Sequence, residues 1–255
     1  MCHHSLVNFF SALFKKPFYI AFFNIFRNFK DPVQILKRYV LGQGEYPADL
    51  TVKTPIGRHT ARVYDFADII TLVECFGKLD YRAPKTITCA VDFGSNIGLS
   101  ALYFLTRGDG VKTYLYEPLP QNIVRLKENL QDFNGRWELK ESAVGLSDGT
   151  ASFQFEPTGR YGRLQDSGEG QCLEVSVQSA VSILEKILSR HDRIDILKID
   201  VEGLENGILS SLNEKILARI DRIYAETDSG PALPGFRQEQ YGAIARYFNL
   251  KVGAK

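Results

Sequence analysis

The sequence contains little cysteine, and its cysteines are not clustered. Four cysteines are spread over 255 residues without any CxxC spacing: Cys2, Cys75, Cys89 and Cys172. Zinc sites and small disulfide frameworks need closely spaced cysteine pairs, so neither is expected here. A reducing, cytoplasmic environment is the expected one.

The sequence also lacks an excess of charge of either sign. Its 31 Lys and Arg residues stand against 30 Asp and Glu residues, which gives a formal net charge of +1. Proteins dedicated to nucleic-acid binding normally carry a basic surplus, so no nucleic-acid partner is expected. A content of 44% hydrophobic and 24% charged residues is that of a globular chain with a buried core.

Long apolar runs are absent as well. A transmembrane helix needs roughly 18 uninterrupted apolar residues, whereas the longest nearly apolar run, residues 18–26, contains Asn24. Lys15–Lys16–Pro17 interrupts the N-terminal apolar stretch, and no small-residue cleavage site follows it. We therefore expect neither a membrane span nor a secretory signal peptide.

What the sequence does contain is a basic, phenylalanine-rich front. Residues 1–40 hold six basic residues and one acidic residue, a net +5, whereas the rest holds 25 basic and 29 acidic residues, a net −4. Apolar residues recur at helical spacing over 6–14 and again over 18–29, which predicts two amphipathic helices. Asn24, Arg27 and Asn28 are expected on a polar face of the second.

Two interpretations of this front stay open. A basic helix with phenylalanine on one face suits peripheral contact with a membrane surface through residues 5–30. The same pattern also suits a helical cap packed on the rest of the protein, or the interface of a homodimer. The second interpretation leaves the protein cytoplasmic, and the first adds a peripheral membrane location.

The spacing of apolar residues and turn signals divides the chain into three parts. Residues 1–45 are interpreted as a helical extension, whose last helix begins at Asp31–Pro32 and runs to about Val40. Residues 46–85 are interpreted as an entry segment, with a hairpin over 50–66 and a short helix over 68–77. Residues 86–255 alternate strands with helices, which predicts an α/β domain with a mostly parallel, three-layer sheet.

The elements predicted for this third part are the following. Strands are expected at 86–92, 113–117, 137–144, 194–201 and 222–227, with short strands at 152–156 and 174–177 around a Gly-rich loop, 159–170. Helices are expected at 97–107, 121–132, 180–190, 204–212 and 238–247, the last leading to a short final strand.

A Gly-containing loop lies where the first predicted strand turns into a helix. It reads Asp92–Phe93–Gly94–Ser95–Asn96–Ile97–Gly98, and its glycines let the backbone and a ligand approach closely. The nicotinamide fingerprint GxGxxG is absent. A carboxylate at this strand end favours a cationic or hydroxyl-rich ligand over a bare pyrophosphate. The alternative for the loop alone is a tight turn without a ligand.

Polar residues also end the next two predicted strands. Glu117 lies 25 residues after Asp92, where an acidic residue usually accepts hydrogen bonds from the ribose hydroxyls of a nucleoside. Ser142 and Ala143 lie at the end of the third strand, where an adenine ring would lie in such a fold. The alternatives are a solvated strand-end glutamate and an ordinary turn.

Two further carboxylates end the strand that is expected to neighbour the first. Asp200 and Glu202 stand at its carboxyl end, in the crevice where open α/β sheets bind ligands. The alternative is that Glu202 or Glu205 only favours the N-terminus of the next helix. We interpret at least one of the two as functional, with Glu226 as a reserve.

Together these residues resemble the FkbM family of S-adenosylmethionine-dependent methyltransferases. The likeness runs from about Tyr64 to Asp228. It is carried by four groups of residues: Asp92, Gly94, Asn96 and Gly98; Glu117–Pro118 with Asn122; Ala143–Val144–Gly145; and Leu197–Lys198–Ile199–Asp200–Val201–Glu202–Gly203. Asp68, Glu74 and Tyr81 are similar to the segment that precedes the first strand in that family.

The resemblance implies a class I methyltransferase (Rossmann-like) fold with S-adenosylmethionine as cofactor. It also implies O-methylation of a sugar, a glycolipid or a small natural product, in keeping with a role in polysaccharide biosynthesis. By resemblance, the cofactor-binding residues are Asp92, Gly94, Ser95, Asn96, Gly98, Glu117, Asn122, Ser142 and Ala143. Asp200 and Glu202 would face the transferred methyl group or the acceptor, as catalytic residues.

Three questions stay open from the sequence. A Rossmann-like module that binds a nucleotide without catalysis would carry the same glycines and Glu117. A metal-assisted methyltransferase could use Asp200, Glu226 and Asp228 as oxygen ligands of Mg²⁺, although no metal is expected. Finally, the short stretch after residue 247 suggests that one strand of the antiparallel hairpin that ends a class I sheet is missing or very short.

Overall fold

The computed structural model describes residues 16–156, 162–164 and 171–252. The chain divides into two compact units, residues 1–82 and residues 83–255. Within the described residues, no helix is both long enough and apolar enough to cross a membrane. The helix expected over residues 6–14 lies outside the described residues.

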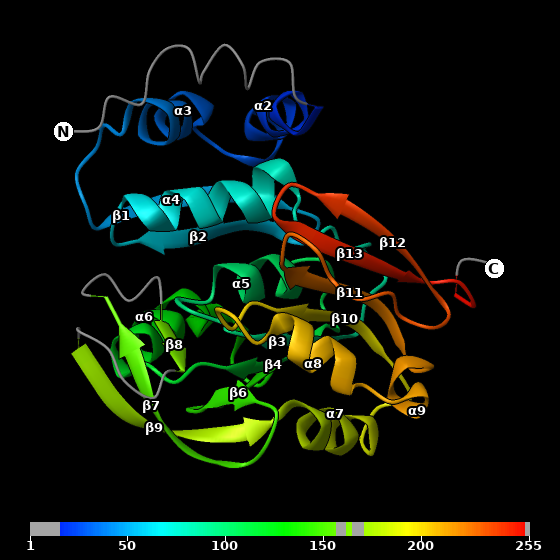
Figure 1. Ribbon diagram of the computed structural model, residues 1–255. Helices are drawn as coiled ribbons and strands as arrows, with labels where there is room; N and C mark the ends of the chain where they lie inside the picture. Colours follow the sequence, from blue (N-terminus) through cyan, green and yellow to red (C-terminus); the bar gives the residue numbers. More distant parts are fainter. Residues whose placement is uncertain (1–15, 157–161, 165–170, 253–255) are drawn as a thin grey trace. The chain divides into compact units, whose positions relative to one another are not determined.

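The first unit combines helices with a β-hairpin (Figure 1). Its elements are α2 (Lys16–Asn28), α3 (Pro32–Leu41), β1 (Ala48–Thr54), β2 (Gly57–Val63), α4 (Phe66–Val73) and η1, a short π-helical turn (Glu74–Lys78). Asp31 begins α3, because its side chain accepts a hydrogen bond from the Gln34 N–H. Asp65 and Asp68 form a reciprocal capping box that begins α4. The helix predicted from Asp31 and the hairpin predicted over 50–66 are thereby confirmed.

The polar face expected for α2 is correct in part: Arg27 is exposed, whereas Asn24 and Asn28 are half-buried. Asn24 and Asn28 do not lie on a solvated polar face, because their side-chain amides donate to the carbonyl oxygens of Gly77 and Phe76, each at 2.8 Å. Ile25 is buried on the same side, whereas Phe22 and Phe26 are exposed. Buried backbone carbonyls need donors, and asparagine supplies them where a phenylalanine would not.

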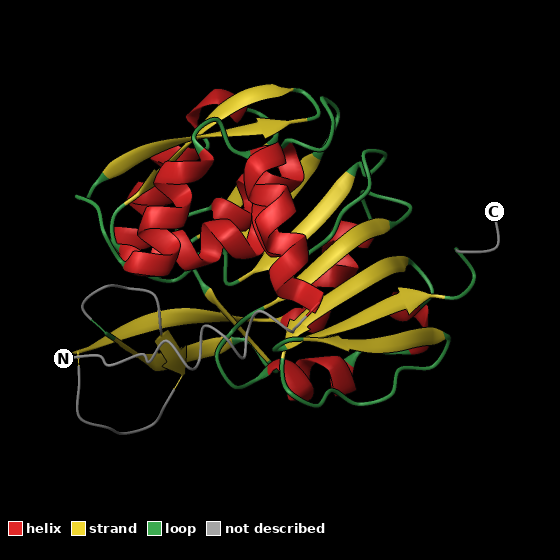
Figure 2. Ribbon diagram, turned by 90° about the horizontal axis from the view of Figure 1, so that it is seen from above, coloured by secondary structure: helices red, strands yellow, loops and turns green. Residues whose placement is uncertain are grey.

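The second unit is built on a seven-stranded sheet in the order β12-β13-β11-β10-β3-β4-β5. The strands are β3 (Cys89–Phe93), β4 (Lys112–Tyr116), β5 (Trp137–Lys140), β10 (Ile194–Ile199), β11 (Ile220–Glu226), β12 (Phe236–Tyr241) and β13 (Ile244–Asn249). Neighbours from β11 to β5 pair in parallel, and only the β12–β13 hairpin introduces antiparallel pairs. Figure 2 shows the twist of these strands.

The order of the strands creates a switch point between β3 and β10. From β3 the chain moves to β4 and β5 on one side, whereas β10 and β11 lie on the other. In open α/β sheets, ligands bind in the crevice at the carboxyl ends of the two strands beside such a switch point. All five residues of β3 are buried, as expected of a central parallel strand.

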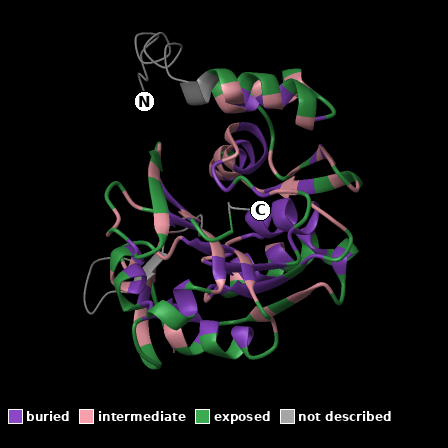
Figure 3. Cartoon of the chain, turned by 90° about the vertical axis from the view of Figure 1, so that its right-hand side faces the viewer, coloured by how far each residue is buried: buried purple, intermediate pink, exposed green. Residues whose placement is uncertain are grey.

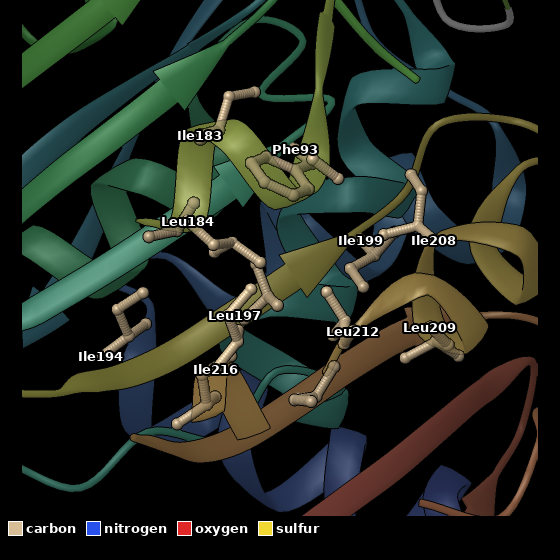
Figure 4. Close-up of a cluster of buried hydrophobic side chains, with 14 of the residues drawn as sticks. Phe93, Ile183, Leu184, Ile194, Leu197, Ile199, Ile208, Leu209, Leu212 and Ile216 are labelled. Carbon is tan, nitrogen blue, oxygen red and sulfur yellow. The ribbon is translucent and has the colours of Figure 1, made fainter. Parts of the chain in front are cut away.

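Helices cover the sheet and complete its core. They are α5 (Leu99–Leu105), α6 (Pro120–Asn129) with the 3₁₀ turn η2 (Gln131–Phe133), α7 (Ala180–Leu188), α8 (Glu205–Ser211) and α9 (Glu214–Leu217). Side chains of α7, α8 and α9 pack on β3, β10 and β11, where Phe93, Leu197 and Ile199 meet Leu184, Ile208 and their neighbours (Figure 4). Buried residues are concentrated along these strands (Figure 3).

A smaller, four-stranded sheet lies beyond β5 in the sequence. Its order is β6-β9-β7-β8, with β6 (Ala143–Gly145), β7 (Gly149–Phe155), β8 (Gly162–Leu164) and β9 (Gln171–Ser179). The strands predicted at 152–156 and 174–177 are confirmed as parts of β7 and β9, which pair antiparallel over seven residues. Most of the Gly-rich loop around β8 lies outside the described residues.

The single strand expected at 137–144 is wrong, because the structure divides it. β5 ends at Lys140 in the large sheet, and β6 begins at Ala143 in the small one. Glu141 and Ser142 form the break between them. The exposure of β5 alternates while β6 is fully buried, so one run of mixed residues serves two sheets.

The helix expected at 238–247 is also wrong, and so is the expected loss of a final strand. The segment forms a hairpin in which Gly242, at φ +63°, and Ala243 make a two-residue turn between β12 and β13. β13 is flanked on both sides, with buried residues at five of its six positions. Such an apolar stretch has no clear period of two, and the packing of the sheet decides its conformation.

Candidate active site

The loop between β3 and α5 contains two glycines with left-handed backbone conformation. Gly94 has φ +79° and Gly98 has φ +85°. A Cβ atom on Gly94 would lie 1.8 Å from the carbonyl oxygen of Asp200, so this loop packs directly against the turn after β10. The N–H groups of Gly94 and Ser95 both donate to the carbonyl oxygen of Tyr116, at 3.1 and 3.0 Å, which ties the loop to β4.

Ser95 and Asn96 hold the shape of this loop. The buried Ser95 hydroxyl donates to the carbonyl oxygen of Asp92 at 2.9 Å and accepts from the Tyr116 N–H at 3.1 Å. Asn96 has φ +47°, and its Oδ1 accepts from the Ile97 N–H at 2.7 Å. Both side chains thus bond to the backbone around them, and these bonds stabilise the shape of the loop.

A buried lysine joins the two carboxylates of the crevice. Lys198 Nζ lies 3.1 Å from Asp92 Oδ1 and 3.0 Å from Asp200 Oδ2, and it donates to the Gly94 carbonyl oxygen at 2.9 Å. The second oxygen of Asp92 accepts from the Ser100 hydroxyl of α5 at 2.5 Å. Lys198 therefore connects β3, the glycine loop and the turn after β10.

Burial and neighbouring charges shift the pKa values of this cluster in opposite directions. Burial alone would lower the pKa of Lys198, but the carboxylates of Asp200 and Asp92 outweigh it and raise that pKa. Burial raises the pKa of Asp92, against the opposing effects of Lys198 and of the hydrogen bond from Ser100. Lys198 consequently keeps its proton and its charge at physiological pH.

Glu117 follows β4 and bonds to the backbone of the glycine loop. Its Oε2 accepts from the Asn96 N–H at 2.9 Å, and its Oε1 accepts from the Leu119 N–H at 3.0 Å and the Asn122 amide at 3.2 Å. Only 4% of Glu117 is exposed. Burial raises its pKa to about 7, although the hydrogen bonds from Leu119, Asn122 and Asn96 act in the opposite direction.

Ser142 and Ala143 lie next to the Glu117 segment, at the break between β5 and β6. The Glu117 N–H donates to the carbonyl oxygen of Lys140 at 3.2 Å, and Ala143 packs in an apolar cluster with Leu119. The buried Ser142 hydroxyl accepts from the Gln178 amide at 2.8 Å. The structure therefore places both residues beside the third parallel strand, with the Ser142 hydroxyl already bonded within the protein.

Asp200 and Glu202 both lie in the turn between β10 and α8, but in different environments. The Asp200 side chain is 24% exposed and ion-paired to Lys198, with its N–H donating to the Phe93 carbonyl oxygen at 3.1 Å. Glu202 is exposed and has φ +59°. The structure brings Asp200 into the Asp92–Lys198 cluster, whereas Glu202 projects from the turn.

Glu205, the first residue of α8, stabilises this turn by hydrogen bonds to its backbone. Its buried carboxylate accepts from the Val201 N–H at 2.9 Å and from the Gly203 N–H at 2.9 and 3.2 Å to its two oxygens. These bonds bridge the residues on either side of Glu202. The unusual backbone conformation of Glu202 is therefore held by Glu205.

These residues lie at the carboxyl ends of adjacent parallel strands, and a family comparison agrees with that arrangement. The sequence matches the family model of the methyltransferase FkbM domain over residues 92–253, which is more than half of the chain. The chain belongs to the FkbM methyltransferase family. S-adenosylmethionine-dependent methyl transfer is the activity of that family, and the class I, Rossmann-like fold predicted from the sequence is confirmed.

Individual relatives are more distant. The chain is 26% identical over 178 residues to the AMB antimetabolite synthetase AmbE of Pseudomonas aeruginosa. The aligned region covers 53% of this chain and 8% of AmbE. Two solved structures are similar in part: a methyltransferase from Geobacter sulfurreducens (15% identity, 65% of this chain and 73% of that one, TM-score 0.36); and an O-methyltransferase from Bacillus cereus in complex with SAH (12% identity, 64% and 75%, TM-score 0.39).

The site fits the methyl donor of the FkbM family on two observations. Gly94 and Gly98 give the loop between β3 and α5 its left-handed turns, at the place where folds of this kind bind the cofactor. Glu117 is a buried carboxylate at the end of β4, where a nucleoside ribose binds in folds of this kind. Within the described ranges, no group of three or more His, Cys, Asp or Glu residues is arranged to hold a metal ion, so the metal-assisted alternative gains no support.

The sequence prediction missed Lys198 and Ser100, and it placed Glu205 only at the start of a helix, without its bonds to the turn before it. Lys198 lies in the same motif as Asp200, but a lysine within an apolar strand gives no sign of the two carboxylates that it joins. Ser100 and Glu205 are each one side of a hydrogen bond that appears only once the helix after a strand is in place. The alternation of β10 places Lys198 on the same face of the sheet as Ile196. A charged residue on that buried face was the one sign in the sequence that Lys198 needs a buried partner.

Proposed function

We propose that this FkbM methyltransferase transfers a methyl group from S-adenosylmethionine to a hydroxyl oxygen of a sugar, a glycolipid or a small natural product. The observation that carries the proposal is the set of acidic side chains at the carboxyl ends of β3, β4 and β10. Asp92, Glu117 and Asp200 contribute three acidic side chains there, and Lys198 contributes one ammonium group. Such a crevice favours a ligand that carries positive charge and several hydroxyl groups.

In this proposal the glycine loop binds the methionine part of the cofactor. Asp92, Gly94, Ser95, Asn96 and Gly98 would line it, with the backbone of the loop as the contacting surface. The side chains of Ser95 and Asn96 bond to the loop itself, so their contribution is to fix its shape.

Glu117 would accept hydrogen bonds from the ribose hydroxyls, with Asn122 fixing the orientation of its carboxylate at 3.2 Å. Ser142 and Ala143 would flank the adenine ring. Glu117 already accepts a hydrogen bond from the Asn96 N–H of the loop. This bond connects the proposed ribose site directly to the proposed methionine site.

When bound, the cofactor supplies a methyl group on a positively charged sulfur. The protein must hold the acceptor oxygen in line with that methyl group, and such alignment contributes about 7–11 kcal/mol to lowering the barrier. A hydroxyl acceptor also needs a base within hydrogen-bond reach. Asp200 is the stronger candidate, because Lys198 fixes one of its oxygens and its side chain is partly exposed at the crevice. Glu202, exposed in the same turn, would contact the acceptor.

The experiment is a transfer assay with isotopically labelled S-adenosylmethionine and a panel of sugar, glycolipid and phenolic acceptors, read by mass spectrometry of the product. A methyl ether whose yield falls at least about a hundredfold in Asp200→Asn supports the proposal. Glu214→Gln, at an exposed position of α9, is the matched control with unchanged yield. Methylation only of nitrogen or sulfur atoms would overturn the proposal that the acceptor is a hydroxyl oxygen.

A second outcome separates catalysis from binding. The alternative is a Rossmann-like module that binds a nucleotide without catalysis, and that alternative predicts cofactor binding without any labelled product across the panel. A chelator arm tests metal assistance: the proposal predicts the same yield with and without EDTA.

A further inference from the structure

The exposed side of α2 carries a row of aromatic side chains. Tyr19, Phe22, Phe23 and Phe26 are 49%, 44%, 71% and 47% exposed, at the spacing of one helical face. The Phe22 ring lies 5.0 Å from the Phe26 ring and 6.3 Å from the Phe23 ring. We call these four residues the aromatic face. Exposed aromatic clusters of this kind mark interaction sites on soluble proteins.

The orientation of this face is fixed by the opposite side of the helix. Ala21, Ile25 and Phe29 are buried within the first unit. Asn24 and Asn28 each donate to a backbone carbonyl oxygen of η1 at 2.8 Å. Rotating α2 to bury the aromatic face would break both hydrogen bonds and expose Ile25 and Phe29. The aromatic residues are thus held outward by the fold of the first unit.

Basic residues surround the same region. Residues 16–41 contain five basic residues and one acidic residue. Arg27, Lys30 and Lys37 are exposed, whereas Arg38 is buried and donates to the Glu45 carbonyl oxygen. The single acid, Asp31, accepts a hydrogen bond from the Gln34 N–H as the N-cap of α3. The exposed surface of α2 and α3 therefore carries positive charge next to aromatic rings.

We propose that the aromatic face docks on the surface of an anionic lipid bilayer. Phenylalanine and tyrosine rings enter the boundary between headgroups and acyl chains, and the cations remain at the level of the lipid phosphates. Each Lys or Arg near an anionic surface adds to the attraction, which falls off within a Debye length. α2 would then lie along the membrane surface, since it is too short to span it.

Charge favours a lipid surface over a second copy of this chain. In a two-fold dimer through the aromatic face, the same patch of each copy meets the other. Such a patch offers Arg27 and Lys30 little opposite charge, because the one acid of residues 16–41, Asp31, already accepts the hydrogen bond that caps α3. An anionic headgroup layer has the opposite charge, and it also accommodates aromatic rings without a matching protein pocket.

The experiment is co-sedimentation of the full-length chain with large vesicles. One set contains phosphatidylcholine alone, and the other adds phosphatidylglycerol as the anionic lipid. The proposal predicts pelleting with the anionic vesicles that is at least about tenfold stronger than with neutral ones, and that weakens in high salt.

Two pairs of variants locate the contact. Phe23→Ser/Phe26→Ser and Arg27→Glu/Lys30→Glu are each expected to weaken binding to anionic vesicles at least about tenfold. The matched controls are Val124→Ser, an exposed apolar residue on α6, and Lys186→Glu, an exposed cation on α7; both are expected to bind like the parent chain. Thermal unfolding of each variant confirms that the fold is kept.

Several results would overturn the proposal. Absence of pelleting by the parent chain is one, and equal pelleting with neutral and anionic vesicles is another. A third is a lipid-free dimer, seen by analytical ultracentrifugation, that Phe23→Ser/Phe26→Ser dissociates. The proposal is independent of the methyl acceptor, because no part of this test measures methyl transfer.

Discussion

Lys198 and Asp92 are direct partners in the parallel register of β10 and β3, and 3.1 Å separates Nζ from Oδ1. Both side chains are almost fully buried, at 3% and 0% exposure. Lys198 also contacts Asp200 and the Gly94 carbonyl oxygen. One buried ion pair therefore bridges the two strands at the switch point, where the proposed cofactor and acceptor sites meet.

Removal of the lysine should destabilise the second unit strongly. Lys198→Met leaves Asp92 buried without its counter-ion, and we expect a loss of about 3–5 kcal/mol in the free energy of unfolding, measured with urea. Lys198→Met/Asp92→Asn should recover part of the loss, because the orphaned charge is gone. Lys186→Met, at an exposed position of α7, is the control. A loss under about 1 kcal/mol in Lys198→Met would contradict the view that Lys198 is the counter-ion of the buried Asp92.

Gly94 should tolerate no side chain. Gly94→Ala places a Cβ 1.8 Å from the Asp200 carbonyl oxygen in a left-handed conformation, so the loop and the turn after β10 must separate. We expect a loss of about 2 kcal/mol or more in unfolding free energy, together with weaker cofactor binding. Gly110→Ala, where a Cβ meets no atom within 4 Å, should be neutral. Equal stability of the two variants would show that the loop is looser than the structure indicates.

The sequence was sufficient for the parallel core of the fold. β3, β4, β10 and β11 are apolar runs followed by glycines or carboxylates, and this pattern identifies buried parallel strands and the edge at which ligands bind. Asp92, Glu117 and Asp200 could be placed at that edge because each directly follows or ends such a run. These predictions depend only on local pattern and on the geometry of parallel sheets.

Other features depend on contacts that no local pattern contains. The β12–β13 hairpin was mistaken for a helix because Ile244–Asn249 is buried on both faces of the sheet. The half-burial of Asn24 and Asn28 could not be predicted, because the carbonyl groups that accept their hydrogen bonds belong to η1, about 50 residues away. Lys198 was missed because its partners come from two other segments.

Glu117 should make the unfolding free energy depend on pH. Its pKa is about 7 in the folded state against an ordinary value of 4.5, so the folded protein binds its proton more tightly than the unfolded chain. The stabilisation is fully present below pH 4.5 and is lost as the pH rises through 7. Between pH 5 and pH 8 the parent chain should lose about 2–3 kcal/mol more than Glu117→Gln. Parallel pH profiles of the two proteins, measured by urea unfolding, would contradict the burial of an ionisable group here.

Glu205 should control the mobility of the turn that carries Glu202. In Glu205→Ala the N–H groups of Val201 and Gly203 lose their acceptor, so their hydrogen exchange should accelerate about tenfold or more. Glu214→Ala, in the first turn of α9, should leave both exchange rates unchanged. Unaltered rates at Val201 and Gly203 in Glu205→Ala would mean that the backbone of the turn is held by other contacts.

Calorimetric titration with S-adenosylmethionine and S-adenosylhomocysteine tests whether Glu117 binds the ribose of the methyl donor. Loss of a hydrogen-bonded carboxylate costs about 1.5–3 kcal/mol, so Glu117→Ala should bind both ligands at least about tenfold more weakly than the parent chain. Glu214→Ala should bind both like the parent chain. Absence of binding by the parent chain would contradict the whole account, whereas unchanged affinity in Glu117→Ala would contradict the role of Glu117.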